Sequence, residues 1–480
     1  MKPNILLIVA DEFRGDCMSF RGHPDVKTPY LDTLAATGIS FHNAQSCCPS
    51  CVPARAVMYT GLSPRHCGRV GYQDNVRWDY PHTIAGELSK AGYYTQCVGK
   101  MHVYPNRSMQ GFHNIELHDG YLHESRYPGV PSGENQLYTD DYFYWLRKEL
   151  GADADVTNTG LDCNSYLARP WGYAEKYHPT NWVTDRSIDF LRRRDPDKPF
   201  FLMASYVRPH APYDAPQYYF DLYKDKDLRP PVYGDWDDRA DLEKMGRRFN
   251  NSTGPIDPEL IRQQQIGYYA CITHLDHQIG RLMVSLIEHQ LMDNTIIIFT
   301  SDHGELLSDH CLCRKSRPYQ GSANVPMIIS GPERLIGARQ GTDSDAIVEL
   351  RDVMPTCLAI AGADPVPTDG ENMLEKAIEQ REYIHGEHTA DLKSTQWIVT
   401  RTDKYVWYTQ TGEEQYFRLD TDPEESHNAI NDLEWSDRID EMRGILIKEL
   451  TGREEGFTDG KELFVGRKQN PCLQNVEPLK

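Results

Sequence analysis

The sequence contains no apolar run long enough to cross a membrane. About 18 consecutive apolar residues are needed to span a bilayer, and the 480-residue chain holds no such stretch. Basic residues are also scarce, because 51 Lys and Arg stand against 71 Asp and Glu, which gives a formal net charge of −20. This charge argues against a general surface for nucleic acid or for anionic lipid. We therefore expect neither nucleic acid nor a membrane as a partner.

Cysteine is too dilute for the disulfide framework of a secreted protein. Twelve cysteines are spread over 480 residues, and mostly buried thiols in a reducing cytosol explain them more simply. The spacing of Cys47, Cys48 and Cys51 does not form two Cys-x-x-Cys zinc knuckles. The apolar run at 5–10 has no small-residue cleavage site before Asp11, so it is a poor signal peptide and reads as a buried strand. A cytoplasmic location is expected.

Short unbroken apolar runs indicate strands that are buried on both faces, which is typical of a parallel sheet covered by helices. Such runs lie at 5–10, 93–98, 199–206, 295–300 and 325–330. Amphipathic stretches that predict helices lie between them at 30–37, 83–91, 182–193 and 262–289. The sequence therefore predicts an α/β fold with a parallel sheet covered by helices.

Chemically active side chains follow four of these predicted strands. They are Asp11 and Glu12, Lys100 and His102, Arg208 and His210, and Asp302 and His303. In open α/β sheets, ligands bind beyond the carboxyl ends of the strands. One polar turn would mean little, because loops are usually polar, but the coincidence of four predicts a site at this edge.

Cys51 lies in the run Ser-Cys-Val-Pro-Ala-Arg-Ala-Val-Met-Tyr-Thr-Gly over residues 50–61. An ordinary catalytic cysteine is a thiolate beside a histidine and does not require such a tail. A proline-marked loop that enters a helix with a buried, inert thiol would also have this sequence. The Cys-x-Pro-x-Arg pattern resembles the signature of type I sulfatases, in which the cysteine is oxidised to formylglycine, an aldehyde that hydrates to a geminal diol.

The resemblance extends through most of the predicted large domain at 1–367. It includes the acidic pair after the first strand, the Gly-Lys-x-His and Arg-Pro-His-x-Pro steps, Ser-Asp-His-Gly-Glu, and Arg314-Lys315 before Tyr319. The chain thus resembles the sulfatases of the alkaline phosphatase superfamily. The resemblance implies the fold of that superfamily, which is α/β with a large mixed, mostly parallel sheet between layers of helices. It also implies a smaller C-terminal antiparallel α+β subdomain.

The resemblance also implies a metal site. Its ligands would be Asp11, Glu12, Asp302, His303 and the oxygen of modified Cys51. Hard carboxylate oxygens favour calcium or magnesium, although imidazole is less typical of such ions. The family implies calcium, with magnesium as the alternative. Glu12 departs from the family, which usually carries Asp at both of the first two positions. In isolation, Asp11 could equally be a helix cap, and Asp302 with His303 a capped turn.

The remaining signature residues are expected around the sulfate ester. A helix that begins at Pro53 or Ala54 would direct its amide groups toward the anion, with Arg55 holding the formylglycine oxygen and the metal carboxylates. By resemblance, Lys100, His102, His210 and Lys315 surround the ester. Their positive charges would stabilise the leaving oxygen. His210 or Lys315 is predicted to protonate the leaving alcohol, with His210 preferred, and His102 is predicted to assist the release of sulfate.

An irregular insertion is expected at 104–180. Its many Tyr and Trp residues suit a pocket wall for a sugar or an apolar ring, and core packing is the equal alternative. Arg169, His178 and Asn181 are the candidate substrate contacts around it.

The pattern of expected strands and helices changes after residue 367. Short strands, a charged helix at 436–451 and an extended tail predict the smaller subdomain over 368–480. Within it, the segment Gly386-Glu387-His388 is a candidate to return a side chain toward the pocket.

The expected function is that of a sulfatase, of arylsulfatase type, acting on a small sulfated substrate. A carbohydrate ester of the glycosaminoglycan class comes first, and aryl or steroid sulfates are alternatives. The alternative enzyme is a formylglycine-dependent phosphonate monoester or phosphodiester hydrolase. The alternative from another class of function is a non-catalytic protein that binds glycan sulfate. A maturing formylglycine-generating enzyme is the implied partner, and no oligomeric state is predicted.

Overall fold

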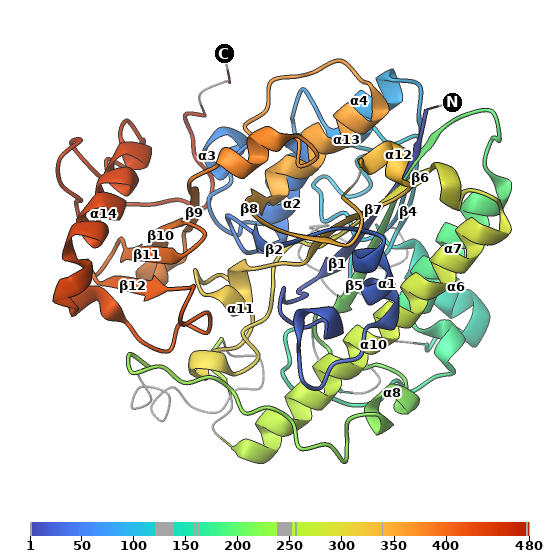
Figure 1. Ribbon diagram of the computed structural model, residues 1–480. Helices are drawn as coiled ribbons and strands as arrows, with labels where there is room; N and C mark the ends of the chain where they lie inside the picture. Colours follow the sequence, from blue (N-terminus) through green and yellow to red (C-terminus); the bar gives the residue numbers. More distant parts are fainter. Residues whose placement is uncertain are drawn as a thin grey trace.

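A large mixed sheet forms the centre of the protein. The computed structural model describes residues 2–120, 139–154, 156, 160–161, 163–237, 252–254, 257–337, 339–476 and 479. Its eight-stranded sheet has the order β4-β3-β5-β1-β6-β7-β2-β8 (Figure 1). The strands are β1 (Asn4–Asp11), β2 (Gly38–Gln45), β3 (Tyr94–Gly99), β4 (Asn114–Leu117), β5 (Phe200–Pro209), β6 (Thr295–Ser301), β7 (Met327–Ser330) and β8 (Thr342–Glu349).

Only β7 among these strands runs against its neighbours. It pairs antiparallel with β6 and with β2, whereas the other neighbouring pairs are parallel. The predicted mixed, mostly parallel sheet is confirmed. The apolar runs did not reveal β2, β4 or β8. Polar residues interrupt β2, and β8 begins with the exposed, polar sequence Thr-Asp-Ser-Asp, so neither forms an unbroken apolar run.

Helices cover both faces of the sheet. All eight residues of β1 are buried, and its side chains alternate between two cores. Leu6 and Ile8 belong to one core, while Leu7 and Val9 belong to the other. This alternation follows from the two-residue period of a strand. It requires an apolar helix layer on each side.

The first core is covered by α1 (Pro29–Ala36), α6 (Asp141–Leu150), α7 (Pro179–Arg193), α8 (Gln217–Asp221) and α10 (Pro258–Glu288). The second is covered by α2 (Cys51–Thr60), α4 (Ile84–Lys90) and α13 (Val353–Ala361). The helices predicted from amphipathic stretches are present as α1, α4, α7 and α10. Shorter helices are α3 (Pro64–Cys67), α11 (Gln320–Ala323) and α12 (Glu333–Ile336).

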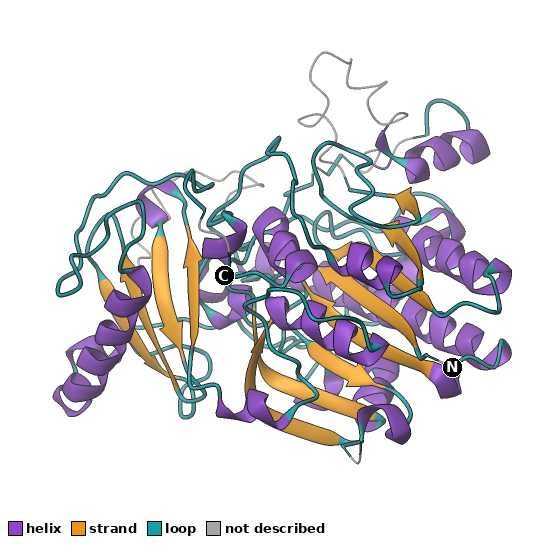
Figure 2. Cartoon of the chain, turned by 90° about the horizontal axis from the view of Figure 1, so that it is seen from above, coloured by secondary structure: helices purple, strands orange, loops and turns teal. Residues whose placement is uncertain are grey.

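A second sheet lies beside the first (Figure 2). It has four antiparallel strands in the order β12-β11-β10-β9. They are β9 (Ile384–His388), β10 (Thr395–Val399), β11 (Asp403–Tyr408) and β12 (Glu414–Arg418), followed by α14 (Ser436–Leu450). Ile398 packs with the α14 side chains, and its neighbours Trp397 and Val399 pack toward the large domain. The expected antiparallel α+β unit is therefore present.

The chain after α14 returns to the large domain. Val70 N donates to Pro471 O at 2.9 Å, and Leu473 N donates to Gly68 O at 2.9 Å. The predicted tail thus packs as a short strand beside the segment that follows α3. Among the described residues, no helix combines the length and the apolarity that a membrane span requires.

Candidate active site

The carboxyl ends of four neighbouring strands meet at one edge of the large sheet. The strands β3, β5, β1 and β6 are consecutive in the sheet order. His210 N donates to Asp11 O at 3.0 Å, and Asp302 N donates to Ala10 O at 3.3 Å. The residues after β1, β5 and β6 are therefore joined through their backbones. The structure brings together the side chains that the sequence placed after separate strands.

Four buried side chains form a candidate metal centre at this edge. One potential ligand atom from each of Asp11, Cys51, Asp302 and His303 lies within 4.8 Å of all the others. The Sγ of Cys51 is 3.2 Å from His303 Nε2 and 3.7 Å from Asp11 Oδ1. Such a grouping of carboxylate, imidazole and a fourth donor is suited to a divalent cation.

Cys51 is held at the first position of α2. The helix begins at Cys51, two residues before the predicted start at Pro53. Pro53 is compatible with this start, because the N–H groups of the first helical turn have no partner within the helix and that group is the one proline lacks. Ser50 precedes the helix in an extended conformation and makes no side-chain cap. The positive end of the helix dipole therefore faces the site, as an anion site requires.

The Cys51 thiol is not activated. Burial, with the nearby Asp11 carboxylate, raises the pKa of Cys51 to about 11 against the opposing charges of Lys100 and Lys315. A thiol with this pKa is protonated at neutral pH and is a weak nucleophile. The site does not suit ordinary thiolate catalysis, which agrees with a residue that acts only after modification.

Arg55 links the signature helix to β5 and to the residues that follow β3 and β6. Its Nε donates to Asp302 Oδ2 at 2.8 Å, and its Nη1 donates to Lys100 O and to Ser205 Oγ, both at 2.9 Å. Arg55 lies one helical turn after Cys51 and is fully buried. It therefore fixes the position of Asp302 beside Cys51, which matches its expected contact with a metal carboxylate.

Lys100 forms an ion pair with Asp11 Oδ2. Burial alone would raise the pKa of Asp11, but Lys100 and the other nearby cations hold it well below its usual value. Asp11 is consequently a carboxylate at neutral pH. An ionised carboxylate is the form that binds a metal.

Glu12 points away from the candidate metal centre. Its Oε1 lies 3.1 Å from Lys315 Nζ, and its Oε2 lies 3.4 Å from His210 Nε2. The backbone turns at Glu12, which has φ +69°, so its side chain leaves in a different direction from that of Asp11. The structure thus places the predicted ligand Glu12 against the basic residues instead.

Lys315 and His210 form a hydrogen-bonded pair. Lys315 Nζ donates to His210 Nε2 at 2.7 Å, while His210 Nδ1 lies 2.8 Å from Ala211 O. Because a carbonyl oxygen can only accept, Nδ1 carries the ring proton and Nε2 is the acceptor. Burial and Lys315 lower the pKa of His210 well below its usual value. Of the two predicted proton donors, Lys315 is therefore the one that carries the proton between them in this arrangement.

The family model for sulfatases matches residues 3–363. This chain belongs to the sulfatase family. It is therefore a sulfuric ester hydrolase, and the non-catalytic alternative is not supported. It is 50% identical to an arylsulfatase of Clostridium perfringens, over 97% of this chain and 98% of that one. It is 28% identical to a choline-sulfatase of Rhizobium meliloti, over 89% and 82% of the two chains.

Solved structures share the fold. The phosphonate monoester hydrolase of Agrobacterium radiobacter superposes with a TM-score of 0.76 at 23% identity, covering 93% of this chain and 95% of that one. BT4656 in complex with D-glucosamine-2-N,6-O-disulfate superposes with a TM-score of 0.72 at 21% identity, covering 94% and 98%. These similarities support the alkaline-phosphatase-like architecture.

His102 lies in the loop after β3, two residues beyond Lys100. Its backbone N–H donates to Asp119 Oδ1 at 3.0 Å, and the residue has φ +58°. Its Nε2 lies 3.6 Å from Asp74 Oδ1, and the half-exposed Tyr72 meets its ring edge-on. Asp74, Asp119 and Tyr72 carried no recognisable signal in the sequence, because each lies in an irregular loop.

The structure places two predicted substrate contacts in the core. His178 is fully buried, and its Nε2 lies 3.3 Å from Asp214 Oδ1. Asn181 Oδ1 lies 2.7 Å from His274 Nε2. Asp214 also accepts two hydrogen bonds from Arg208, at 2.6 and 2.7 Å. These residues form a polar network behind the turn that carries His210, so they position the site from within.

The aromatic residues of the insertion are also mainly core. Tyr142 and Trp171, with Trp182 just beyond the insertion, are buried and belong to the first core, which favours the packing alternative over a pocket wall. Arg169 donates its backbone N–H to Tyr213 O at 3.1 Å. Part of the insertion, at 121–138, lies outside the described residues.

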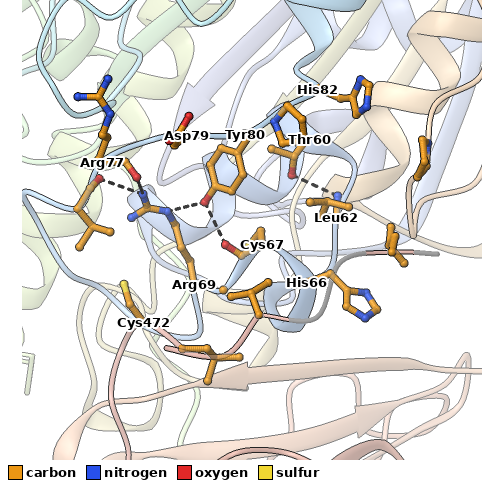
Figure 3. A pocket seen from close by; sticks show the side chains of 17 residues that line it. Thr60, Leu62, His66, Cys67, Arg69, Arg77, Asp79, Tyr80, His82 and Cys472 are labelled. Atoms are coloured by element: carbon orange, nitrogen blue, oxygen red, sulfur yellow. Dashed lines mark hydrogen bonds between the residues drawn. The ribbon is translucent and has the colours of Figure 1, made fainter.

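A separate cavity lies between the segment after α2 and the C-terminal tail (Figure 3). It has a volume of about 470 Å³, and its lining includes Leu62, Cys67, Tyr80 and Cys472. Arg69 Nε donates to Tyr80 Oη at 2.7 Å across its wall. The cavity contains none of the predicted catalytic or metal residues, so it is distinct from the sulfatase site.

Proposed function

We propose that this enzyme hydrolyses the sulfate monoester of a small substrate through a formylglycine made from Cys51. The observation that carries the proposal is the grouping of Asp11, Cys51, Asp302 and His303 within 4.8 Å, at the start of a helix. A carbohydrate sulfate is the proposed natural substrate. The arylsulfatase relative at 50% identity also supports turnover of aryl sulfates.

Asp11, Asp302 and His303 would hold a divalent cation, with an oxygen of residue 51 as a further ligand. The two carboxylates are fully buried and already paired with Lys100 and Arg55, and carboxylate oxygens are the ligands that hard divalent cations prefer. Calcium is the proposed ion, with magnesium as the alternative, since both prefer carboxylate oxygen. Such an ion supplies an electrophile and favours the deprotonated form of a bound hydroxyl.

A hydrated aldehyde at position 51 would supply one hydroxyl for attack on sulfur and a second for the release of sulfate. Around it, Lys100, Arg55 and Lys315 supply fixed positive charge. The sulfate ester is an anion whose bridging oxygen gains charge as the S–O bond breaks, so preorganised cations lower this barrier.

The proton for the leaving alcohol is proposed to come from Lys315 Nζ. Burial alone would lower the pKa of Lys315, but Glu12 and its other anionic neighbours raise it above its usual value, so the ammonium is the resting form. His210 Nε2 accepts a hydrogen bond from that ammonium and orients it. His102 is proposed to take a proton when sulfate is released.

The proposal includes a maturing formylglycine-generating enzyme as a transient partner. It also includes a cytoplasmic location, which is supported by twelve cysteines that are all free thiols.

The test combines mass spectrometry with turnover of 4-nitrophenyl sulfate. Protein produced together with a formylglycine-generating enzyme should carry an aldehyde in the peptide that contains residue 51, and it should be active. Cys51→Ala should lose about a thousandfold or more of the activity, whereas the matched control Cys163→Ala should retain it. Activity that survives Cys51→Ala would overturn the mechanism.

A phosphonate monoester hydrolase is the second candidate, because one with a TM-score of 0.76 shares the fold. Comparison of kcat/KM for 4-nitrophenyl sulfate and for a 4-nitrophenyl phosphonate ester separates the two. A faster phosphonate reaction would favour the second candidate.

A further inference from the structure

The small sheet reaches the active site through the end of β9. Glu387 N donates to Cys47 O at 2.8 Å, close to the signature helix, and Thr389 N donates to Val70 O at 2.7 Å. His388 lies between these two anchored residues. The second sheet therefore inserts one histidine between the loop before α2 and the segment that follows α3.

His388 is buried, but its ring has no hydrogen-bond partner. Only 3% of the residue is exposed, and among the described residues neither Nδ1 nor Nε2 has a partner. Burial lowers the pKa of His388 to about 3, and the charges of Arg317 and His303 contribute to the shift. Glu387 N donates to Cys47 O, and Ser316 N donates to Pro49 O. The residues next to His388 and to Arg317 are therefore both anchored to the segment 47–49, directly before the signature helix. Buried polar groups usually have partners, so an unpartnered imidazole here indicates a ligand.

Arg317 lies two residues after Lys315 and has no carboxylate partner among the described residues. The hydrogen bond of its guanidinium is a long one, 3.4 Å from Nη1 to Ser316 O. The loop that carries it is fixed, because Ser316 N donates to Pro49 O at 2.9 Å. By contrast, Arg55 and Arg208 each donate to a buried carboxylate. The chain has a net charge of −20, so acidic partners are abundant. Among the described residues, Arg317 has no carboxylate partner and the ring of His388 has no hydrogen-bond partner. Their N–H groups are therefore available to an anion.

We propose that Arg317 and His388 form a second anion-binding point for the substrate whose sulfate ester is cleaved. This inference rests on the proposed function and names its substrate class: a sulfate ester that carries a further anionic group, either a carboxylate or a second sulfate. The planar guanidinium can donate two parallel hydrogen bonds to either group. A neutral imidazole can add a third through its N–H. Contacts at two points orient the ester for in-line attack.

The test compares pairs of substrates that differ in one charge. The carboxylate pair is a sulfooxybenzoate and the corresponding sulfooxybenzamide. The second-sulfate pair is a hexosamine 6-sulfate with an N-sulfate or an N-acetyl group. For each pair, the ratio of the two kcat/KM values is measured on one enzyme preparation, so the fraction of folded or matured protein cancels.

The wild-type enzyme should prefer the dianionic substrate in at least one pair by about tenfold, which is typical of a charged hydrogen bond. Arg317→Gln should reduce this ratio to near one, and His388→Gln should reduce it in part. The controls are Arg192→Gln, which removes the same charge from an exposed position of α7, and His385→Gln on β9, where His385 is paired with Gln396. Both controls should keep the wild-type ratio.

The inference is overturned if the wild type shows no preference in either pair, or if the preference survives both Arg317→Gln and His388→Gln. The pair that shows the preference identifies the group as carboxylate or sulfate. Failure of the proposed function is a different result. Protein with a verified aldehyde at residue 51 would then cleave no sulfate ester at all, 4-nitrophenyl sulfate included.

Discussion

At the scale of single residues, Asp11 and Glu12 are adjacent in the sequence but have opposite surroundings. Lys100 and other cations overcome the effect of burial and hold the pKa of Asp11 well below its usual value. Burial raises the pKa of Glu12, although the Lys315 ammonium 3.1 Å away opposes the shift. The turn at Glu12, with φ +69°, separates the two side chains. One carboxylate faces the candidate metal centre, and the other faces the proposed proton donor.

Removal of the divalent cation should destabilise the protein. A ligand that binds only the folded state at 100 times its Kd contributes about 2.7 kcal/mol, so chelation should lower the thermal midpoint by a few degrees. Added calcium or magnesium should restore it, and the more effective ion identifies the metal. Asp302→Asn keeps an oxygen for Arg55 but should make the midpoint insensitive to chelation. An unchanged wild-type midpoint after exhaustive chelation contradicts the site.

His23 should make the protein sensitive to mild acid. Its Nδ1 accepts hydrogen bonds from the backbone N–H groups of Asp25 and Val26, at 3.2 and 3.1 Å. Burial lowers the pKa of His23 to about 4, below the ordinary value near 6.5 in the unfolded chain. The stability it contributes is therefore complete above pH 6.5 and is lost as the pH falls toward 4.

The loss attributable to His23 at pH 5 is about 2 kcal/mol. In His23→Asn, the amide oxygen can accept the hydrogen bonds that Nδ1 accepts in the wild type. The asparagine side chain does not titrate. Thermal midpoints at pH 7.5 and pH 5 should therefore differ less for His23→Asn than for the wild type. Equal differences would show that His23 does not titrate in this range.

At the scale of elements, the ends of the strands decide where the reactive groups lie. Gly99 ends β3 with φ +101°, and a Cβ there would lie 1.9 Å from Ser205 O on β5. Lys100 N donates to the same oxygen at 2.9 Å. The close approach of two backbones therefore fixes the start of the loop that carries Lys100 and His102. Only glycine permits both the conformation and the contact.

Gly99→Ala should separate β3 from β5 at the active-site edge. We expect a loss of about 3 kcal/mol or more, together with a large loss of activity, because both the clash and the positive φ oppose alanine. Gly92→Ala is the matched control, since Gly92 has φ +91° and open space around its Cβ position. That variant should lose only about 1 kcal/mol. Similar losses in the two variants, measured by urea unfolding, would contradict the role of the contact with Ser205.

At the scale of the whole molecule, an acidic protein carries a basic site. The net charge is −20, whereas Lys100, Lys315, Arg55 and Arg317 gather around one edge of the large sheet. The body should repel long polyanions, and the site should attract a single small anion. The second sheet completes this site by inserting His388, so the two sheets have a shared function.

Short substrates should therefore be cleaved faster than sulfated polymers. At low ionic strength, kcat/KM for an intact sulfated polysaccharide should be below that for its disaccharides. The polymer rate should rise with added salt, because salt screens charges that are more than about 10 Å apart. Rates measured between about 20 and 200 mM salt test this. A polymer rate that exceeds the disaccharide rate at low salt would contradict it.

Local sequence was sufficient for the fold class and for the core of the site. Mainly apolar runs identified β1, β3, β5, β6 and β7, since a strand buried on both faces is largely apolar, although β3 also buries Thr95 and Gln96. The polar turns after four of them could be assigned to one edge, because parallel strands end together. The Cys-x-Pro-x-Arg run then placed Cys51 at that edge by resemblance.

Only the tertiary structure decided which partners the individual side chains meet. Glu12 lies 3.1 Å from Lys315, His178 is paired with Asp214 inside the core, and the residues on either side of His388 join β9 to Cys47 and Val70. The sequence sets local conformation and periodicity, which depend on near neighbours. Hydrogen bonds and ion pairs depend on the direction of each side chain and on residues far along the chain, and those are fixed only when the elements pack.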